Sequence, residues 1–123
     1  MYARMVTSYV KPNQLRKMTA LYQNSVLPLV EHQPGYRGIF VFNKPEENKE
    51  ISVTFWQTLA EMEAFDLNLL PIQDQFMPLL EAAPEIEIFQ VVVPEDVPPI
   101  DDVALSEASL GIRIEDPFST ALR

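Results

Sequence analysis

The chain has 123 residues, a formal net charge of −9 at pH 7, one histidine and no cysteine. A chain of this length can bury an ordinary core as a single domain. Its negative charge repels phosphate backbones and anionic membrane surfaces, so we expect neither nucleic acid nor membrane as a partner. The lack of cysteine excludes disulfides and thiolate metal sites, and one histidine cannot build a His-based metal centre. We therefore expect no metal site.

The apolar stretches of the sequence are short. None approaches the ~20 residues that a membrane-spanning helix needs. The first residues also lack the basic start and apolar middle of a signal peptide. We therefore expect a cytoplasmic protein.

The first two elements are a strand and a long helix. Residues 2–10 alternate, which places Ala3, Met5, Thr7 and Tyr9 on one side and Tyr2, Arg4, Val6 and Ser8 on the other. Apolar residues then recur at helical spacing across residues 13–32, and Asn13 is suited to cap the start. Pro28 cannot donate to the carbonyl of Asn24, so we expect a kink or a weakened turn there.

A hairpin, a second helix and a last strand follow. Residues 38–43 and 50–57 are apolar runs on either side of a polar turn, and they predict an antiparallel hairpin. A second helical pattern starts at Leu59, and Pro71 should break that helix into two pieces. Residues 86–93 predict the last strand of the core.

An internal repeat supports this order of elements. Pro-Leu-Val-Glu-His-Gln-Pro occupies residues 28–34, and Pro-Leu-Leu-Glu-Ala-Ala-Pro occupies residues 78–84, at an offset of 50. A strand, a helix and a strand are thus encoded twice. The order βαββαβ predicts an α+β, ferredoxin-like fold with a four-stranded antiparallel sheet.

A sheet of this kind carries helices on one face only, so its other face needs cover. The second and fourth strands are nearly apolar throughout, which indicates burial on both faces. Packing two such sheets face to face would form a closed α+β barrel, so we expect a homodimer.

The composition changes after residue 93. Residues 94–123 are rich in proline and carry a charge of −5, against −4 for residues 1–93. We therefore divide the chain into a domain at 1–93 and a C-terminal extension at 94–123. Its apolar residues leave two alternatives open, an arm that docks on the partner subunit or a partly mobile terminus.

Three segments carry a family resemblance. These are Ser-Val-Leu-Pro at 25–28, Gln-Pro-Gly-Tyr-Arg-Gly at 33–38 and Thr-Phe-Trp at 54–56. Together they resemble the antibiotic biosynthesis monooxygenase group of the dimeric α+β barrel superfamily, over roughly residues 1–93. The resemblance implies a ferredoxin-like protomer, a homodimer built from two packed sheets and a hydrophobic pocket between sheet and helices.

The resemblance also implies two kinds of chemistry. Enzymes of this group oxygenate small aromatic, polyketide-like substrates, often without metal or flavin, or they degrade haem. The haem-degrading members need a His and a Trp on the second helix and an Asn on the first strand. Residues 59–80 contain neither His nor Trp, and residues 2–10 contain no Asn. We therefore do not expect haem degradation, and we expect no cofactor.

Two residues are weak candidates for a catalytic role. His32 has an unperturbed pKa near neutrality, which suits proton transfer. It also lies in the last turn of a predicted helix, where a cation stabilises the helix dipole. Trp56 could stack on an aromatic ligand, although a lone Trp that closes a strand is more often part of a core or an interface.

The remaining candidates line the expected pocket or form ion pairs. The expected pocket residues are Trp56, Tyr22, Phe65 and Met18. A buried arginine needs an anionic partner, so we expect salt bridges at Arg4 and Arg37. The acids Glu61, Glu63 and Asp66 fall near the start of the second helix, where negative charge is stabilising.

Two functions follow from these observations. The first is binding of a small apolar or aromatic metabolite, with cofactor-independent monooxygenation as the reaction if the protein is an enzyme. The alternative is a non-catalytic ligand-binding or assembly module of the same fold. A cavity between sheet and helices would favour the first function, and solid packing by Met18, Tyr22, Phe65 and Phe76 would exclude an enzyme.

Overall fold

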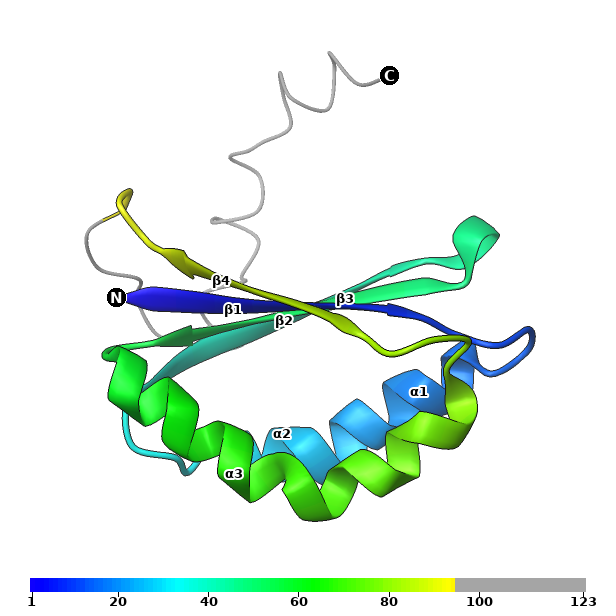
Figure 1. Ribbon diagram of the computed structural model, residues 1–123, viewed down its shortest axis with the longest axis horizontal. Helices are drawn as coiled ribbons and strands as arrows, with labels where there is room; N and C mark the ends of the chain where they lie inside the picture. Colours follow the sequence, from blue (N-terminus) through cyan, green and yellow to red (C-terminus); the bar gives the residue numbers. More distant parts are fainter. Residues whose placement is uncertain (95–123) are drawn as a thin grey trace, which may run out of the picture.

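The computed structural model describes residues 1–94, and the predicted C-terminal extension lies outside the described residues apart from Pro94. Four strands form one antiparallel sheet in the order β2-β3-β1-β4, and the helices cover one face of it (Figure 1). The strands are β1 (Tyr2–Tyr9), β2 (Tyr36–Lys44), β3 (Lys49–Trp56) and β4 (Glu85–Gln90). The helices are α1 (Leu15–Leu21), α2 (Leu27–Val30) and α3 (Leu59–Phe76). The predicted ferredoxin-like βαββαβ fold is confirmed.

The register of the sheet decides which side chains face the helices. β1 lies between β3 and β4, and it pairs Arg4 with Thr54, Val6 with Ser52 and Ser8 with Glu50. Side chains alternate along a strand, so one face of the sheet carries this polar row. The same face lies against the helices, because Arg4 pairs with Asp66 of α3 and Ser52 accepts from Tyr22.

The first helical segment is continuous but irregular. α1 leads into one π-helical stretch at Tyr22–Val26, in which the amide of Leu27 donates to the carbonyl of Tyr22, and α2 follows directly. The irregularity predicted at Pro28 therefore falls in the turn just before it, because proline supplies no amide to close a normal turn. The predicted cap at Asn13 is wrong, since this residue is left-handed with φ 65° and Gln14 precedes the helix.

α3 is not broken at Pro71, so that prediction is wrong. The helix runs through Pro71 and bows beneath the sheet, and it ends in a 3₁₀ turn at Met77–Leu79 that contains Pro78 (Figure 1). At its start, Thr58 Oγ1 accepts from the amide of Glu61 at 3.2 Å and donates to Glu61 Oε1 at 2.9 Å. This reciprocal cap confirms the predicted helix-stabilising position of Glu61.

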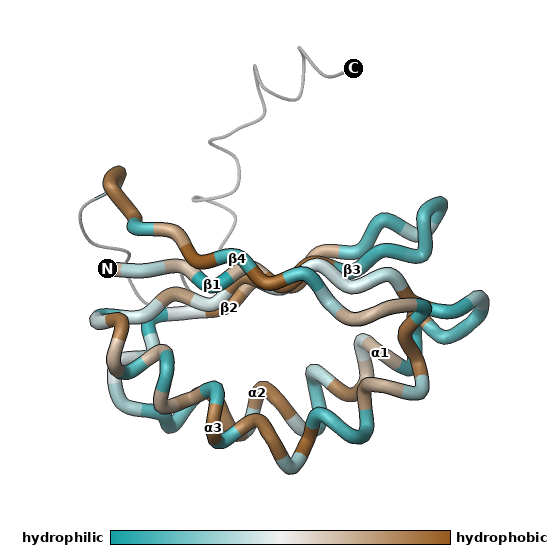
Figure 2. The backbone as a smooth tube through the Cα atoms, in the orientation of Figure 1, coloured by the Kyte–Doolittle hydropathy of each residue, from teal (hydrophilic) through white to brown (hydrophobic). Residues whose placement is uncertain are grey.

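The hairpin of β2 and β3 is confirmed, with a 3₁₀ turn at Pro45–Glu47 and a left-handed Asn48. Its tip is hydrophilic, whereas the stretch that follows β4 is hydrophobic (Figure 2). β4 ends at Gln90, earlier than the predicted 86–93.

Two groups of buried apolar side chains form the core. One gathers around Trp56 and the start of α3, and the other gathers around Val10 and the end of α3. The first consists of Val26, Val30, Trp56, Met62 and Phe65, and the second of Val10, Met18, Leu79 and Leu80. A cavity separates them.

Candidate ligand-binding site

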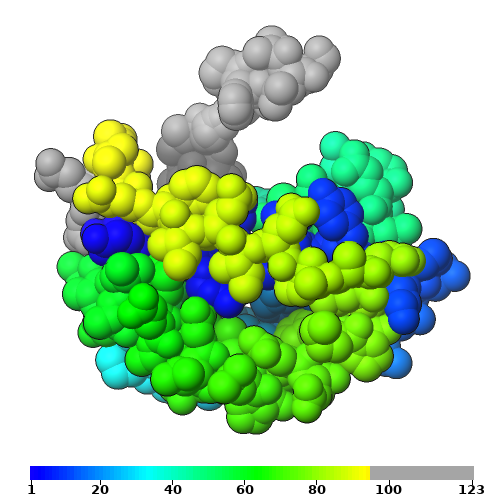
Figure 3. Space-filling model, viewed as in Figure 1, coloured from blue at the N-terminus to red at the C-terminus, as the bar shows by residue number. Residues whose placement is uncertain are grey.

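The cavity lies between the helix-facing side of the sheet and the helical layer. Its volume is about 180 Å³, slightly more than the roughly 150 Å³ that accommodates a benzene ring in an apolar cavity. The surface is hollowed between β4 and α3 (Figure 3). Met18, Tyr22, Phe65 and Phe76 therefore do not pack this space solid.

Most of the cavity wall is apolar, and its polar groups come mainly from the sheet. The apolar lining residues are Val6, Met18, Val26, Ile39, Phe65, Leu69, Phe76, Met77, Leu80, Pro84 and Ile86. The polar lining residues are Arg4, Ser8, Tyr22, Ser52, Thr54 and Gln73. Such a combination is typical of small-molecule sites, in which a few polar groups orient a mostly apolar ligand.

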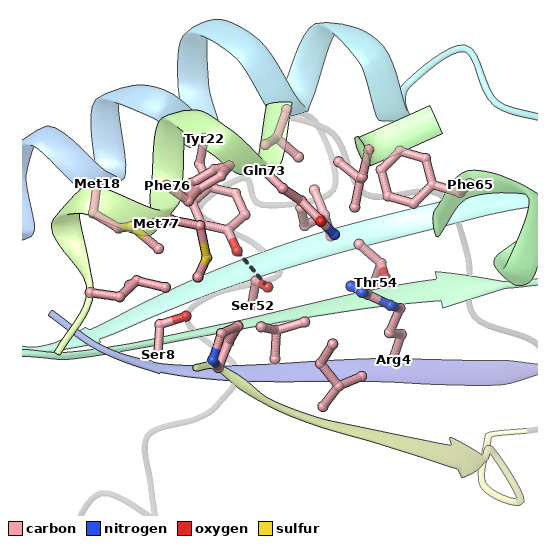
Figure 4. A pocket seen from close by; sticks show the side chains of 17 residues that line it. Arg4, Ser8, Met18, Tyr22, Ser52, Thr54, Phe65, Gln73, Phe76 and Met77 are labelled. Carbon is pink, nitrogen blue, oxygen red and sulfur yellow. Dashed lines mark hydrogen bonds between the residues drawn. The ribbon is translucent and has the colours of Figure 1, made fainter. Parts of the chain in front are cut away.

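Arg4 is the one charged residue among those that line the cavity. Its side chain rises from the central strand β1 and extends toward the cavity beside Thr54 (Figure 4). Its Nε lies 2.8 Å from Asp66 Oδ1 on α3, which confirms the predicted ion pair. The Arg4 side chain is 9% exposed and that of Asp66 is 39% exposed, so solvent screens only the carboxylate side of the pair.

Tyr22 and Ser52 join the helical layer to the sheet. The Tyr22 hydroxyl donates to Ser52 Oγ at 3.0 Å across the cavity wall (Figure 4). Burial raises the pKa of Tyr22, and the negative charge of Glu50 adds to the increase, so the phenol is neutral near pH 7. Tyr22 and Val26 both belong to the π-helical stretch, and both line the cavity.

Trp56 lies behind the cavity wall. It is fully buried, its ring packs against Phe65 with centroids 5.0 Å apart, and its Nε1 donates to Thr54 Oγ1 at 2.9 Å. It is not among the lining residues, so the structure does not place it against a ligand. The other three residues expected in the pocket, Met18, Tyr22 and Phe65, do line the cavity.

His32 lies outside the cavity wall. It is exposed in the turn that follows α2, and it is absent from the cavity lining. The predicted position in the last turn of the helix is wrong, because α2 ends at Val30 and no basic residue lies in its last turn.

The sequence patterns did not mark five of the polar lining residues as part of the pocket, namely Arg4, Ser8, Ser52, Thr54 and Gln73. The alternation of residues 2–10 already placed Arg4 and Ser8 on one side of β1. A buried arginine on the helix-facing side was the signal available, but the sequence does not reveal that an empty space adjoins it. Gln73 lies on the long helix, and no pattern marked it.

A buried carboxyl group flanks the polar row. Glu50 is 1% exposed, Thr19 Oγ1 donates to its Oε2 at 2.9 Å, and its Oε1 has no hydrogen-bond partner among the described residues. The Asn43 amide nitrogen, in the orientation that satisfies its neighbours, also donates to Oε2 at 2.6 Å. Burial raises the pKa of Glu50 to about 7, against the lowering effect of the Thr19 hydrogen bond.

Within residues 1–94, no three His, Cys, Asp or Glu side chains gather in a way that could hold a metal ion. No helix in that range combines the length and apolar character needed to cross a membrane.

The fold and the cavity define a ferredoxin-like α+β protein with a pocket between sheet and helices. The model of the antibiotic biosynthesis monooxygenase family matches residues 1–66, and the chain belongs to that family. No curated protein matches the chain.

Solved structures share the fold at low sequence identity. Rv0793 from Mycobacterium tuberculosis is 10% identical with a TM-score of 0.66, over 77% of this chain and 98% of that one. A Nitrosomonas europaea protein named for the same family is 12% identical with a TM-score of 0.69, over 76% and 91%. Another protein from that organism, of unknown function, is 21% identical with a TM-score of 0.65, over 76% and 91%. At these identities the likeness concerns the fold.

Proposed function

We propose that this protein binds a small apolar or aromatic metabolite in the cavity between its sheet and helices. The observation that carries this proposal is a largely apolar cavity of about 180 Å³ whose polar groups come mainly from the sheet. Apolar walls favour an aromatic body, and the polar groups of the sheet suit oxygen substituents at one end of the ligand. The volume favours a ligand with one aromatic ring over a large fused system.

Membership of the family supports cofactor-independent oxygenation as the reaction. In that reaction an activated CH₂ group loses a proton to give a carbanion, which reacts with dioxygen. One oxygen atom remains as a carbonyl, and the second leaves as water with the two hydrogens of the substrate. The protein would contribute shape, exclusion of water and hydrogen bonds to the developing charge.

One observation favours the alternative of binding without turnover. No His, Asp or Glu is among the residues that line the cavity, and the pKa of Tyr22 is raised. The cavity wall therefore holds no group with a pKa near neutrality that could take a proton from a substrate. A ligand-binding module needs no such group.

Binding is tested by ligand titration monitored through the fluorescence of Trp56, the single tryptophan of the chain, which packs against the lining residue Phe65. A panel of monocyclic phenols and quinols should quench it saturably. Leu69→Phe fills the cavity and should abolish the quenching. Leu67→Phe, on the exposed side of the same helix, is the matched control. Absence of saturable binding to the whole panel would contradict the proposal.

Oxygen uptake separates the two functions. An oxygenase should consume dioxygen with quinols or anthrone-like compounds, and Leu69→Phe should stop it. Since His32 is exposed and Trp56 does not line the cavity, His32→Ala should retain the rate, and Trp56→Phe should act only through the packing around Thr54. Saturable binding without any oxygen uptake would support the non-catalytic module.

We also propose that two copies pair through the sheet face that carries no helices. Phe40 and Phe42 stack on this face with centroids 5.8 Å apart, and Phe55 meets Phe40 edge to face at 6.3 Å. Phe89 on β4 adds another exposed apolar ring. An apolar surface of this kind supports association with a second sheet.

A further inference from the structure

Several hydrogen-bond donors of the cavity floor lack acceptors among the described residues. Arg4 is buried, and its Nε lies 2.8 Å from Asp66 Oδ1 as an ion pair without forming a hydrogen bond. No hydrogen bond joins its two terminal nitrogens to another described residue. These nitrogens carry N–H groups arranged in a planar fork that matches a carboxylate or another oxyanion. A guanidinium so placed needs an acceptor from water or from a ligand.

Thr54 adds a donor next to Arg4, its direct partner in the β1–β3 register. The Trp56 indole nitrogen can only donate, and it donates to Thr54 Oγ1 at 2.9 Å. This bond occupies an acceptor site of the threonine oxygen and leaves its hydroxyl hydrogen available. Because Thr54 lines the cavity, its hydroxyl group can donate this hydrogen to a ligand.

The Tyr22–Ser52 pair supplies another donor. Two hydroxyl groups share a single hydrogen bond of 3.0 Å, so whichever of them donates, one hydroxyl hydrogen remains unused. Both residues line the cavity, and Ser52 lies two positions before Thr54 on the same face of β3. The unused hydrogen therefore belongs to the same row of donors as Arg4 and Thr54.

Among the described residues, Asp66 and Glu50 are the carboxyl groups that adjoin this row, and neither lines the cavity. Asp66 forms an ion pair with Arg4 Nε and is partly exposed to solvent. Glu50 lies opposite Ser8 at the end of the row, and burial raises its pKa to about 7, so much of it is neutral near that pH. Neither group occupies the side of Arg4 that faces the cavity.

We propose that Arg4, Thr54 and the Tyr22–Ser52 pair form an oxyanion site, and that the ligand of this cavity is an aromatic compound bearing an ionised oxygen. Carboxylate, phenolate and enolate oxygens share this chemistry. The inference rests on the proposed function, since it requires that the cavity binds a ligand at all. It assigns Arg4 as the residue that selects the charge of the ligand, and it assigns Trp56 as a positioning residue that acts through Thr54.

The test compares benzoate with benzamide, which have nearly the same shape and differ in charge. Isothermal titration calorimetry of the full chain at neutral pH should show benzoate binding at least about tenfold more tightly. Arg4→Met should abolish this preference and leave benzamide affinity nearly unchanged. Lys17→Met removes an exposed positive charge on α1 and should retain the preference.

Thr54 provides a second test that leaves the arginine in place. Thr54→Ser keeps the hydroxyl and should keep the benzoate preference, whereas Thr54→Val removes the donor and should reduce it several-fold. Equal affinities of the wild-type protein for benzoate and benzamide would overturn the oxyanion site and leave the proposed binding function standing. If neither compound nor the panel of phenols binds, the binding function fails, and the oxyanion site fails with it.

Discussion

At the scale of single residues, Glu50 shows how burial links the fold to pH. Its carboxyl group is 1% exposed on the helix-facing side of β3, where burial raises its pKa from 4.5 to about 7. Between these two values the folded state holds a proton that the unfolded state has released. The free energy of unfolding therefore falls as the pH rises through this window and levels off above about pH 7.

Glu50→Gln should remove this dependence. The amide carries no charge, so the variant should match the wild type near pH 4.5 and exceed it above pH 7 by up to about 3 kcal/mol. Urea unfolding at several pH values between about 4.5 and 8 measures the difference. Glu81→Gln, an exposed acid in the loop before β4, should leave the pH profile unchanged. A profile for Glu50→Gln parallel to that of the wild type would show that Glu50 titrates normally.

The backbone conformation at position 35 and the nearby side chain of Glu61 both require glycine there. It has φ +82°, and a Cβ atom there would overlap the side chain of Glu61, which caps α3 together with Thr58. We expect Gly35→Ala to cost about 1–3 kcal/mol of unfolding free energy, part from the left-handed backbone and part from the displaced glutamate. In a Glu61→Ala background the added cost should fall toward about 1 kcal/mol, as a double-mutant cycle of urea unfolding would show. Additive effects would mean that no overlap occurs.

The candidate site was only partly predictable at this scale. Alternation places Arg4 on the correct face of β1, and the burial rule predicts its acidic partner, because both depend on local pattern and on the cost of an unpaired charge. The alternation of side chains along a strand does not indicate at which positions the helices pack closely on the sheet and at which positions a cavity lies between them. Trp56 lies where the start of α3 packs closely, so it is core, while Thr54, two residues earlier, adjoins the cavity.

At the scale of elements, periodicity predicted each helix and strand, and the errors within the helices lie at prolines, apart from the cap at Asn13. Pro28 was expected to distort its own turn, but the turn before it is π-helical instead and compensates for the missing amide. Tyr22 and Val26 of this π-helical stretch line the cavity. Pro71 was expected to break α3, yet the helix continues and bows. Packing of Phe65 on one side of Pro71 and Phe76 on the other holds both halves against the sheet layer, which outweighs the local cost of the proline.

Pro71→Ala should therefore stabilise the protein. The alanine amide can donate to the carbonyl of Leu67, and Pro71 is exposed, so little packing is lost. We expect a gain of about 1–2 kcal/mol in urea unfolding, after allowing for the greater freedom of the unfolded chain. Pro78→Ala is the matched control, because Pro78 lies in the first turn of the 3₁₀ segment, where an amide hydrogen bond is not required, and its effect should be small. A destabilised Pro71→Ala variant would show that packing requires the bow of α3.

At the scale of the whole molecule, the two faces of the sheet differ in the side chains that they carry. The helix-facing side carries the polar row and the cavity, and the other side carries the aromatic cluster of Phe40, Phe42 and Phe55. The repeat visible in the sequence explains this division, because each strand-helix-strand half adds its helix to the same face. The helices thereby cover one face, and the described residues place no helix on the other.

If a second copy covers that face, light scattering at micromolar concentration should report twice the chain mass of 14.1 kDa. Phe42, which is 54% exposed, lies in the aromatic cluster, so Phe42→Glu would bury a carboxylate against its counterpart across the interface and should yield a folded species of single-chain mass. Leu67→Glu places the same charge on the exposed side of α3, at a residue that is 68% exposed, and should remain dimeric. Circular dichroism of each variant separates dissociation from unfolding. A wild-type protein that stays monomeric across this concentration range would mean that something other than a second sheet covers the face, and residues 95–123 of the same chain would then be the first segment to remove in a repeat of the measurement.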